Sequence, residues 1–419
     1  MADDGRRPWR VQSQPVSTSG IPAAASADDR AVTAERCAAQ LLCGDRAGSP
    51  EEVARRLLAI QAQDPRGARL AIRARSAGLC ASDVDSALTR RSMIVTWLNR
   101  GTLHLVRAED YWWLHPLTTG QLHAGNSRRL AQEGVPPEDA ERAVAAVRAA
   151  LAADGPLTRS QLRERAAAAG VRTEGQAMVH ILALASIRGL IVRGPVAGRD
   201  QAFVLTRDWL GAPPPAMDRE AALGELARRY LAGHAPAADR DLARWAGIGL
   251  RDARLGLARC GAVQRADRLA EMPARPQRAA AAPPPPRLLG AFDPLLLGWA
   301  SRDPITGPHR RIVTAGGLFR PFALAGGRAV ATWTIKDGQV VLAPFAELDP
   351  ETRAALDTDA ADVTRSSANK PPASYRRSAT ASGARRADHR YPHVSRQPLP
   401  GSPSPAAIRR MEDQQHEQR

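Results

Sequence analysis

Two glutamines and an aspartate stand close together at Gln61, Gln63 and Asp64. A glutamine amide both accepts and donates hydrogen bonds, but it cannot take up a full proton at neutral pH. Two such amides suffice for bond cleavage only where the leaving group is already activated. A polar helix end that faces solvent has the same composition, so these residues have to be judged by the elements around them.

The segment 51–64 is predicted to be a helix that carries both glutamines. A serine and a proline precede it and its first turn is acidic, which is typical of a helix start. Apolar side chains recur at helical spacing and place Gln61 on the inward face. Pro65 restricts the residue before it and so predicts that the helix ends near Asp64. Gln61 and Gln63 would then converge only because the helix is ending, since helical residues two apart do not face each other.

Residues 94–106 have the pattern of a β-hairpin. Ile94 to Leu98 alternate as in a strand, Asn99-Arg100-Gly101 suits the turn, and Thr102 to Val106 returns as a β-rich strand. Helices followed by a two-stranded hairpin are typical of a winged helix, a DNA-docking unit related to the helix-turn-helix.

Two stretches of this region resemble the AlkZ/YcaQ family of bacterial winged-helix DNA glycosylases. They are QAQD at 61–64 and TWLNRGTLHLV at 96–106. The resemblance extends over roughly residues 30 to 365, and the later segments GAFDPLLLGW, GLFRP and GGRAVATW resemble the C-terminal barrel of that family.

The resemblance implies roles for five residues. The AlkZ branch of the family carries a Gln-x-Gln catalytic motif at this position, which implies that Gln61 and Gln63 are catalytic. In the hairpin it implies that Arg100, Thr102 and His104 bind DNA near the lesion. A tip arginine can contact phosphate or enter a minor groove, although a solvated turn is the alternative for Arg100. A satisfied structural histidine is the alternative for His104.

The chemistry of such an enzyme limits its substrates. Cutting a base from its sugar passes through an oxocarbenium-like centre at C1′. An N7-alkylated purine is cationic and departs as a neutral base, so two amide oxygens that position a water and stabilise the charged sugar would suffice. Asp64 could instead supply a general base, but capping of the Asp-Pro turn is the favoured interpretation.

The chain of 419 residues is predicted to be α+β, with tandem winged-helix domains followed by a small C-terminal antiparallel β-barrel. Turn and capping signals, such as the capping box Thr158-x-x-Gln161, divide it. The predicted segments are a disordered N-terminus (1–29), winged helix 1 (30–135), winged helix 2 (136–212), winged helix 3 (217–272), a Pro-rich linker (273–286), the β-barrel with a closing helix (287–365) and a disordered basic tail (366–419).

The net charge of +16 suits a polyanionic partner, nucleic acid first. Arginine richness that merely follows the base composition of the gene is the alternative. From Arg365 onward the chain holds eleven Lys or Arg and four Asp or Glu, so +7 of the surplus belongs to the tail. The folded part is therefore only moderately basic.

Several chemistries are disfavoured by the composition. The four cysteines show no spacing that suggests zinc or an iron–sulfur cluster, so we expect no metal, no cofactor and reduced thiols. Lys336 and Lys370 are the two lysines, in a predicted hairpin turn and in the tail, which argues against Schiff-base lyase chemistry. No apolar run reaches membrane-spanning length and no apolar signal core is present.

The sequence thus predicts a monofunctional DNA glycosylase without lyase activity, acting on cationic N7-alkylated purines in double-stranded DNA. Bulky or interstrand cross-link adducts are a further expected substrate class. We expect a cytoplasmic, nucleoid-associated monomer with no membrane contact. The alternative is a non-catalytic winged-helix DNA-binding protein or transcriptional regulator, which would need nothing from Gln61 and Gln63.

Overall fold

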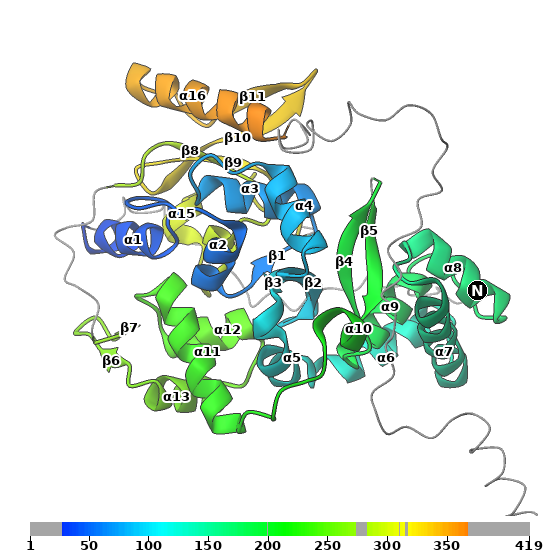
Figure 1. Ribbon diagram of the computed structural model, residues 1–419. Coiled ribbons are helices and arrows are strands. Elements are labelled where there is room, and N and C mark those ends of the chain that lie inside the picture. Colours follow the sequence, from blue (N-terminus) through cyan, green and yellow to red (C-terminus); the bar gives the residue numbers. More distant parts are fainter. Residues whose placement is uncertain (1–26, 199, 274–282, 310, 315–316, 368–419) are drawn as a thin grey trace, which may run out of the picture. The chain divides into compact units, whose positions relative to one another are not determined.

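The computed structural model describes residues 27–198, 200–273, 283–309, 311–314 and 317–367, all within one compact unit. Figure 1 shows their helices and strands. The basic tail beyond residue 367, most of the predicted N-terminal segment and most of the Pro-rich linker lie outside the described residues. The helix α1 (Ala27–Ala39) nevertheless begins inside the segment predicted to be disordered.

The predicted single helix over 51–64 is wrong. The helix α2 (Pro50–Leu57) starts as expected, with the Ser49 side chain accepting a hydrogen bond from the Glu52 amide. It stops at Leu58, whose φ of +65° turns the backbone out of the helix. Pro65 does not close this helix but opens the next one, because proline at the first helical position needs no amide hydrogen.

Between these two helices the chain forms a short strand, β1 (Ile60–Gln61). The helices α3 (Pro65–Ala74) and α4 (Ala81–Thr89) follow it. The predicted hairpin is confirmed as β2 (Met93–Leu98) and β3 (Thr102–Arg107), joined in register with Thr96 opposite His104. Asn99 takes the positive φ that the tight turn requires.

A second set of helices precedes a second hairpin. The helices are η1 (Ala108–Asp110), α5 (Tyr111–Thr119), α6 (Leu122–Gln132), α7 (Pro137–Asp154), α8 (Arg159–Ala168) and α9 (Ala177–Ile187). The capping box at α8 is confirmed, because the Gln161 side chain accepts from the Thr158 amide at 2.9 Å while the Thr158 hydroxyl accepts from the Gln161 amide. The strands β4 (Ile191–Ala197) and β5 (Asp200–Leu205) complete the hairpin, and α10 (Thr206–Leu210) follows.

The two hairpins share one antiparallel sheet in the order β1-β3-β2-β4-β5. Val95 of β2 pairs with Arg193 of β4 and joins them. Apolar side chains of both hairpins consequently contribute to the same two hydrophobic clusters. The hairpin that follows the glutamines is therefore part of a larger sheet.

A third set of helices lies beyond residue 217. It consists of α11 (Arg219–His234), α12 (Asp239–Ala246) and α13 (Leu250–Arg259), followed by the short strands β6 (Val263–Gln264) and β7 (Ala270–Glu271). The helices α11 and α13 pack closely, because a Cβ at Gly256 would lie 2.5 Å from the Leu223 carbonyl oxygen. None of the described helices is long and apolar enough to cross a membrane.

The predicted C-terminal barrel is wrong, because the sheet there is open. Its strands run in the order β11-β10-β9-β8, with bounds β8 (Arg287–Leu289), β9 (Phe322–Ala325), β10 (Arg328–Lys336) and β11 (Gln339–Pro344). Short helices α14 (Pro294–Leu297) and α15 (Asp303–Thr306) lie between β8 and β9. Val313 makes an isolated bridge to Phe319 and belongs to none of these strands.

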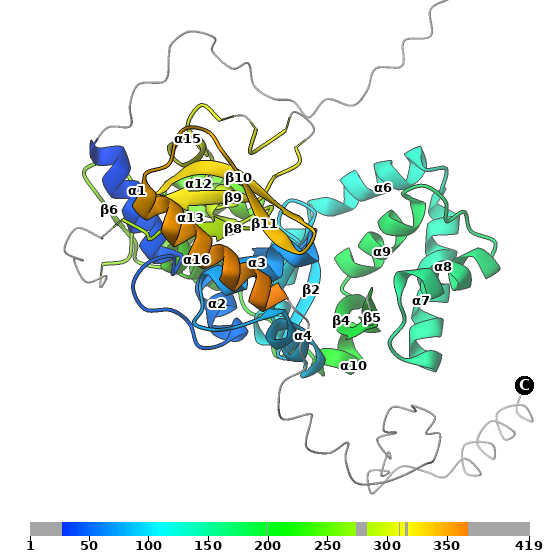
Figure 2. The ribbon, with the colours of Figure 1, turned by 90° about the horizontal axis from the view of Figure 1, so that it is seen from above.

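The helix α16 (Pro350–Ser367) covers this open sheet, as Figure 2 shows. Leu356 and Val363 of α16 are buried with Trp333 of β10 and Leu70 of α3 in one apolar cluster. Burying these side chains gives the sheet the apolar cover that barrel closure would otherwise have supplied. The same contact brings α16 against α3, the helix that follows the glutamines.

Candidate functional site

Gln61 and Gln63 converge, although not in the way that the sequence predicted. Gln61 lies on β1, where side chains two residues apart point to the same side of the backbone. The Gln61 side chain is only 8% exposed, and its Nε2 donates a hydrogen bond to Oε1 of the exposed Gln63 at 3.3 Å. The pair therefore links a buried position to the surface.

The other end of the Gln61 amide has no partner. Its Oε1 is buried and accepts no hydrogen bond among the residues that the structure describes. Buried polar atoms are normally satisfied, and leaving an acceptor unsatisfied costs roughly 1–3 kcal/mol. Such an acceptor is suited to a donor that arrives with a substrate.

His104 lies directly opposite Gln61 in the register between β1 and β3. Its side chain is 5% exposed, and Nδ1 lies 2.9 Å from the carbonyl oxygen of Thr102. Burial lowers the pKa of His104 to about 3, with the nearby charge of Arg100 lowering it further and the Thr102 carbonyl raising it. The ring is therefore neutral at physiological pH.

Thr102 itself is half-buried, and its hydroxyl is buried without a hydrogen-bond partner among the described residues. On the far side of His104, Thr96 is fully buried and its hydroxyl lies 3.0 Å from that of Ser186 on α9. Gln61, Thr96 and His104 thus form a polar row across three strands. Sequence reasoning missed Thr96, whose only signal was its place opposite His104 in the hairpin.

Asp64 is held by the backbone. Its carboxylate accepts a hydrogen bond from the Arg66 amide at 3.0 Å and caps the N-terminus of α3. Asp64 is thus a cap, as favoured, but it caps the start of α3 and not a turn at the end of the preceding helix. An Asp-Pro pair can end one helix or start the next. Here it starts α3, so the glutamines lie before a helix and not at the end of one.

Arg100 is docked on another helix. Its guanidinium donates to the carbonyl oxygens of Arg244 at 2.7 Å and Trp245 at 3.1 Å, at the C-terminal end of α12. A Cβ at Gly247 would lie 2.7 Å from the Asn99 carbonyl oxygen, so the hairpin tip and α12 are in backbone contact. Arg100 fastens the hairpin tip, and its predicted contact with DNA stays a prediction.

Two further arginines were not singled out from the sequence. Arg244 and Arg302 lie close enough to Arg100 that their charges add to burial, the larger effect, in lowering its pKa to about 10. Arg100 remains charged at neutral pH, so the three cations form an electropositive cluster. Their separation in the chain hides this cluster from any local motif.

A groove of about 360 Å³ lies beside the start of α3. Its basic lining comes from Arg66, Arg69 and Arg73, and its opposite side from the β4–β5 hairpin near Val196. Arg69 is paired with Asp85 through a 2.9 Å hydrogen bond, whereas Arg66 is exposed. Asp85 also lines the groove and Arg73 pairs with Asp359, so Arg66 is the lining arginine best placed to contact an anionic backbone.

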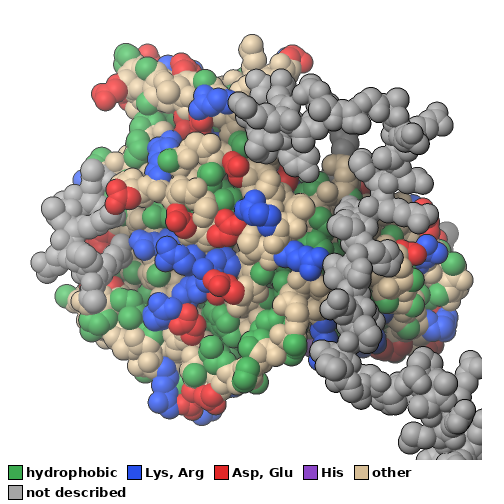
Figure 3. Space-filling view, in the orientation of Figure 1, with side chains coloured by type: hydrophobic (Ala, Val, Ile, Leu, Met, Phe, Trp, Pro, Cys, Tyr) green, Lys and Arg blue, Asp and Glu red, His purple; other side chains and the backbone are tan. Residues whose placement is uncertain are grey.

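On the face that Figure 3 presents, the basic side chains do not form one uninterrupted patch. Figure 3 shows them interspersed with acidic ones over α1 and α2 on the face that it presents. This agrees with the moderate charge expected for the folded part. The described part holds no group of three or more His, Cys, Asp or Glu side chains that could bind a metal ion.

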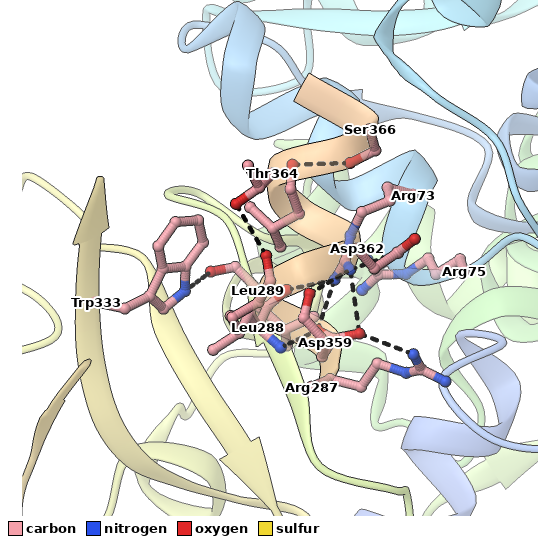
Figure 4. Close-up of polar contacts among 12 residues, drawn as sticks. Arg73, Arg75, Arg287, Leu288, Leu289, Trp333, Asp359, Asp362, Thr364 and Ser366 are labelled. Carbon is pink, nitrogen blue, oxygen red and sulfur yellow. Dashed lines mark hydrogen bonds and ion pairs between the residues drawn. The ribbon is translucent and has the colours of Figure 1, made fainter. Parts of the chain in front are cut away.

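An ion-pair network joins α3, the helix that follows the glutamines in the chain, to α16 and β8 (Figure 4). Arg73 pairs with Asp359 of α16 at 2.9 Å and donates to the Leu288 carbonyl of β8 at 2.9 Å. Arg287 pairs with the same carboxylate at 3.0 Å. Burial would raise the pKa of Asp359, but hydrogen bonds and charges from Arg73 and Arg287 outweigh it and lower that pKa.

The start of α3 depends on a close backbone approach. A Cβ at Gly67 would lie 2.4 Å from the Ala291 carbonyl oxygen. Gly67→Ala should therefore push α3 away and destabilise the protein by about 1–3 kcal/mol. Gly125→Ala, on the exposed face of α6 with nothing within 4 Å, should be neutral or slightly stabilising. Urea denaturation of both variants measures this, and equal midpoints would contradict the close packing.

Comparisons with known proteins match this arrangement. A family model described as DNA glycosylase AlkZ-like matches residues 54–366. The chain is 29% identical over 363 residues to an interstrand DNA cross-link repair glycosylase of Streptomyces sahachiroi, covering 81% of this chain and 96% of that protein. The solved structure of the Streptomyces sahachiroi DNA glycosylase AlkZ is similar with a TM-score of 0.66 at 27% identity, covering 80% of this chain and 96% of that one. The family match includes both glutamines and the hairpin.

Proposed function

This chain belongs to the AlkZ-like DNA glycosylase family, as its motifs predicted, and we propose from that premise that it hydrolyses the N-glycosidic bond of cationic N7-alkylated purines in double-stranded DNA. The observation that carries the proposal is the amide pair. Gln61 and Gln63 are hydrogen-bonded to each other, and Gln61 Oε1 is a buried acceptor without a partner in the part of the chain that the structure describes. The nearest motif carboxylate, Asp64, is engaged as a helix cap.

The chemistry follows from the charge of the leaving base. As the C1′–N9 bond breaks, its electron pair neutralises the cationic purine, so no acid has to protonate the base. Positive charge moves to the sugar, where the oxygens of Gln61 and Gln63 stabilise it without forming a covalent bond. Neutral bases such as uracil leave as anions, and the two amides supply no acid to protonate them.

The route is hydrolytic rather than lyase-type. A lyase needs an amine of lowered pKa that reaches C1′. Lys336, the lysine within the described residues, is exposed at the β10–β11 turn beside Asp337. The product is therefore an abasic site in an uncut strand.

DNA binding is assigned to the helix-and-hairpin sets, which we propose act as winged helices. The groove beside α3 and the cluster of Arg100, Arg244 and Arg302 supply the positive charge. The relative from Streptomyces sahachiroi is named for interstrand cross-link repair, and bulky or cross-linked adducts are the corresponding substrates proposed here. The protein acts as a monomer.

The test incubates the protein with duplex DNA that carries one N7-methylguanine and scores abasic sites by alkaline cleavage. The parent should release the base, and Gln61→Ala with Gln63→Ala should lose at least about 100-fold in single-turnover rate, because charge-stabilising groups of this kind contribute that much. The exposed Gln132→Ala is the matched control and should keep the parental rate.

Other outcomes have definite meanings. Tight DNA binding without release by any protein would favour a winged-helix regulator. Release by the double variant at the parental rate would place the chemistry elsewhere. Strand breaks before alkali treatment would contradict the proposal that lyase activity is absent.

A further inference from the structure

Three polar side chains form one row across a sheet face that also carries Thr102. Gln61, His104 and Thr96 are register partners across β1, β3 and β2, flanked on the same face by buried Ile94 and Val106. Directly opposite residues in an antiparallel pair place their Cβ atoms about 4.5–5.5 Å apart. The Gln61 amide and the His104 imidazole are therefore within reach of one small molecule.

The tautomer of His104 follows from its hydrogen bond. Nδ1 lies 2.9 Å from the carbonyl oxygen of Thr102, and a carbonyl oxygen can only accept. Nδ1 therefore carries the hydrogen, and in the neutral ring Nε2 bears a lone pair. The Thr102 carbonyl fixes both the ring orientation and the nitrogen that is left basic.

Two acceptors thus face the site without a donor. Nε2 of His104 makes no hydrogen bond with any described residue, and Oε1 of Gln61 is likewise unpartnered. The Gln61 Nε2 donates one of its two hydrogens to Gln63, and among the described residues no hydrogen bond joins it to the imidazole. A water molecule has two hydrogens, one for each acceptor, and keeps a lone pair free.

We propose that His104 is a catalytic residue that, together with Gln61, holds the attacking water and takes its proton. This deepens the proposed glycosylase function and rests on it. Gln61 Oε1 and His104 Nε2 accept the two hydrogens of the water, which directs its lone pair towards C1′. The arrangement gives His104 a chemical role in place of the DNA contact that the family resemblance implied.

The step balances without a further reactant. The water oxygen forms a bond to C1′ while the C1′–N9 electron pair departs with the cationic purine, which leaves neutral. The new C1′ hydroxyl is at first protonated and strongly acidic, so a weak base is sufficient to accept that proton. His104 Nε2 takes it and then releases it to solvent, which restores the neutral ring.

Two substitutions separate this role from a structural one. His104→Asn keeps an amide donor near the position of Nδ1 and loses the acceptor at Nε2. His104→Gln places an amide oxygen near the position of Nε2 but does not reproduce the donor to Thr102. The exposed His123→Asn on α6 is the matched control.

The experiment measures single-turnover release of N7-methylguanine, and separately the Kd for a duplex with an uncleavable abasic analogue. His104→Asn should lose about 100-fold in rate, as expected for a lost acid–base group, with Kd unchanged, and His104→Gln should stay within about tenfold of the parent. Thermal melting establishes that each variant is folded. A folded His104→Asn with the parental rate, or one whose loss is entirely in Kd, would overturn the proposal.

If His104→Gln does not fold, the rate and Kd of His104→Asn still decide between the alternatives. Failure of the parent to release any base would instead reject the proposed glycosylase function. The two failures are therefore distinguishable in the same assay.

Discussion

Replacing Arg75 with methionine should lower the free energy of unfolding by about 3–5 kcal/mol, because it leaves a buried carboxylate without its cation. Arg75 follows α3, and neither its side chain nor that of Asp293 is exposed at all. The guanidinium contacts the two carboxylate oxygens at 2.7 and 2.9 Å and donates to Gln40 Oε1 at 2.7 Å. The pair joins α3 to the segment that leads into α14.

The control for this prediction is an ion pair of similar length on the surface. Arg228 lies 2.6 Å from Glu225 but is 50% exposed, so Arg228→Met should cost less than about 1 kcal/mol. Adding Asp293→Leu to Arg75→Met should recover part of the loss, since it removes the uncompensated charge. Urea denaturation measures all three variants. If Arg75→Met and Arg228→Met lowered the free energy of unfolding equally, burial would not increase the cost of breaking the Arg75–Asp293 pair.

Mild acid should destabilise the protein strongly, before its carboxylates are protonated. Burial, the largest effect in each case, lowers the pKa of His104 to about 3, of His115 to about 4 and of His234 to about 3. In the unfolded chain histidine has a pKa of about 6.5. The unfolded state therefore binds more protons between these values, and stability falls as the pH falls.

The size of this effect follows from linkage. The stabilisation is fully present above pH about 6.5 and is lost progressively down to the folded pKa values. Going from pH 7.5 to pH 5, each histidine lowers the free energy of unfolding by roughly 2 kcal/mol, and the three together lower it by about 6 kcal/mol. Since the whole stability of a domain is about 5–15 kcal/mol, urea midpoints at pH 7.5 and pH 5 should differ greatly.

His234 offers the sharpest variant for this measurement. Its ring stacks on Tyr230 with centroids 4.6 Å apart, and its Nε2 is buried without a partner among the described residues. His234→Phe keeps an aromatic ring there and removes the titrating group, so the stability difference between the two pH values should shrink by about a third. The exposed His123→Asn should leave it unchanged. If the His234→Phe protein lost as much stability between pH 7.5 and pH 5 as the parent, His234 would not be a cause of the acid sensitivity.

Local patterns predicted the parts of the fold that local forces determine. The hairpin of β2 and β3, the capping box at Thr158 and the cap at Asp64 all depend on residues within a few positions of one another. Periodicity failed at β1, because two residues are too few to show a strand and Leu58 has no side-chain signal for a positive φ. The sequence correctly predicted that the two glutamines converge, but it predicted a helix end where the structure has the strand β1.

Contacts between residues far apart in the sequence could not be predicted, for a different reason. The pairing of Val95 with Arg193 and the docking of Arg100 on α12 join segments that no spacing rule connects. The open C-terminal sheet was mistaken for a barrel because strand patterns do not say whether an edge is paired or covered by a helix. The orientation of His104 also required the structure, since it depends on where the Thr102 carbonyl lies.

The ion pair between Arg73 of α3 and Asp359 of α16 can form only late in protein synthesis. Arg73 and Asp359 are 286 positions apart in the chain. At about 5–20 residues per second the ribosome needs roughly 15–60 seconds to make the segment between them. Throughout that time Arg73 of α3 lacks its partner Asp359. A nascent chain that stalls before α16 therefore cannot form this ion pair. The ion pair between α3 and α16 can therefore form only after the ribosome has made α16.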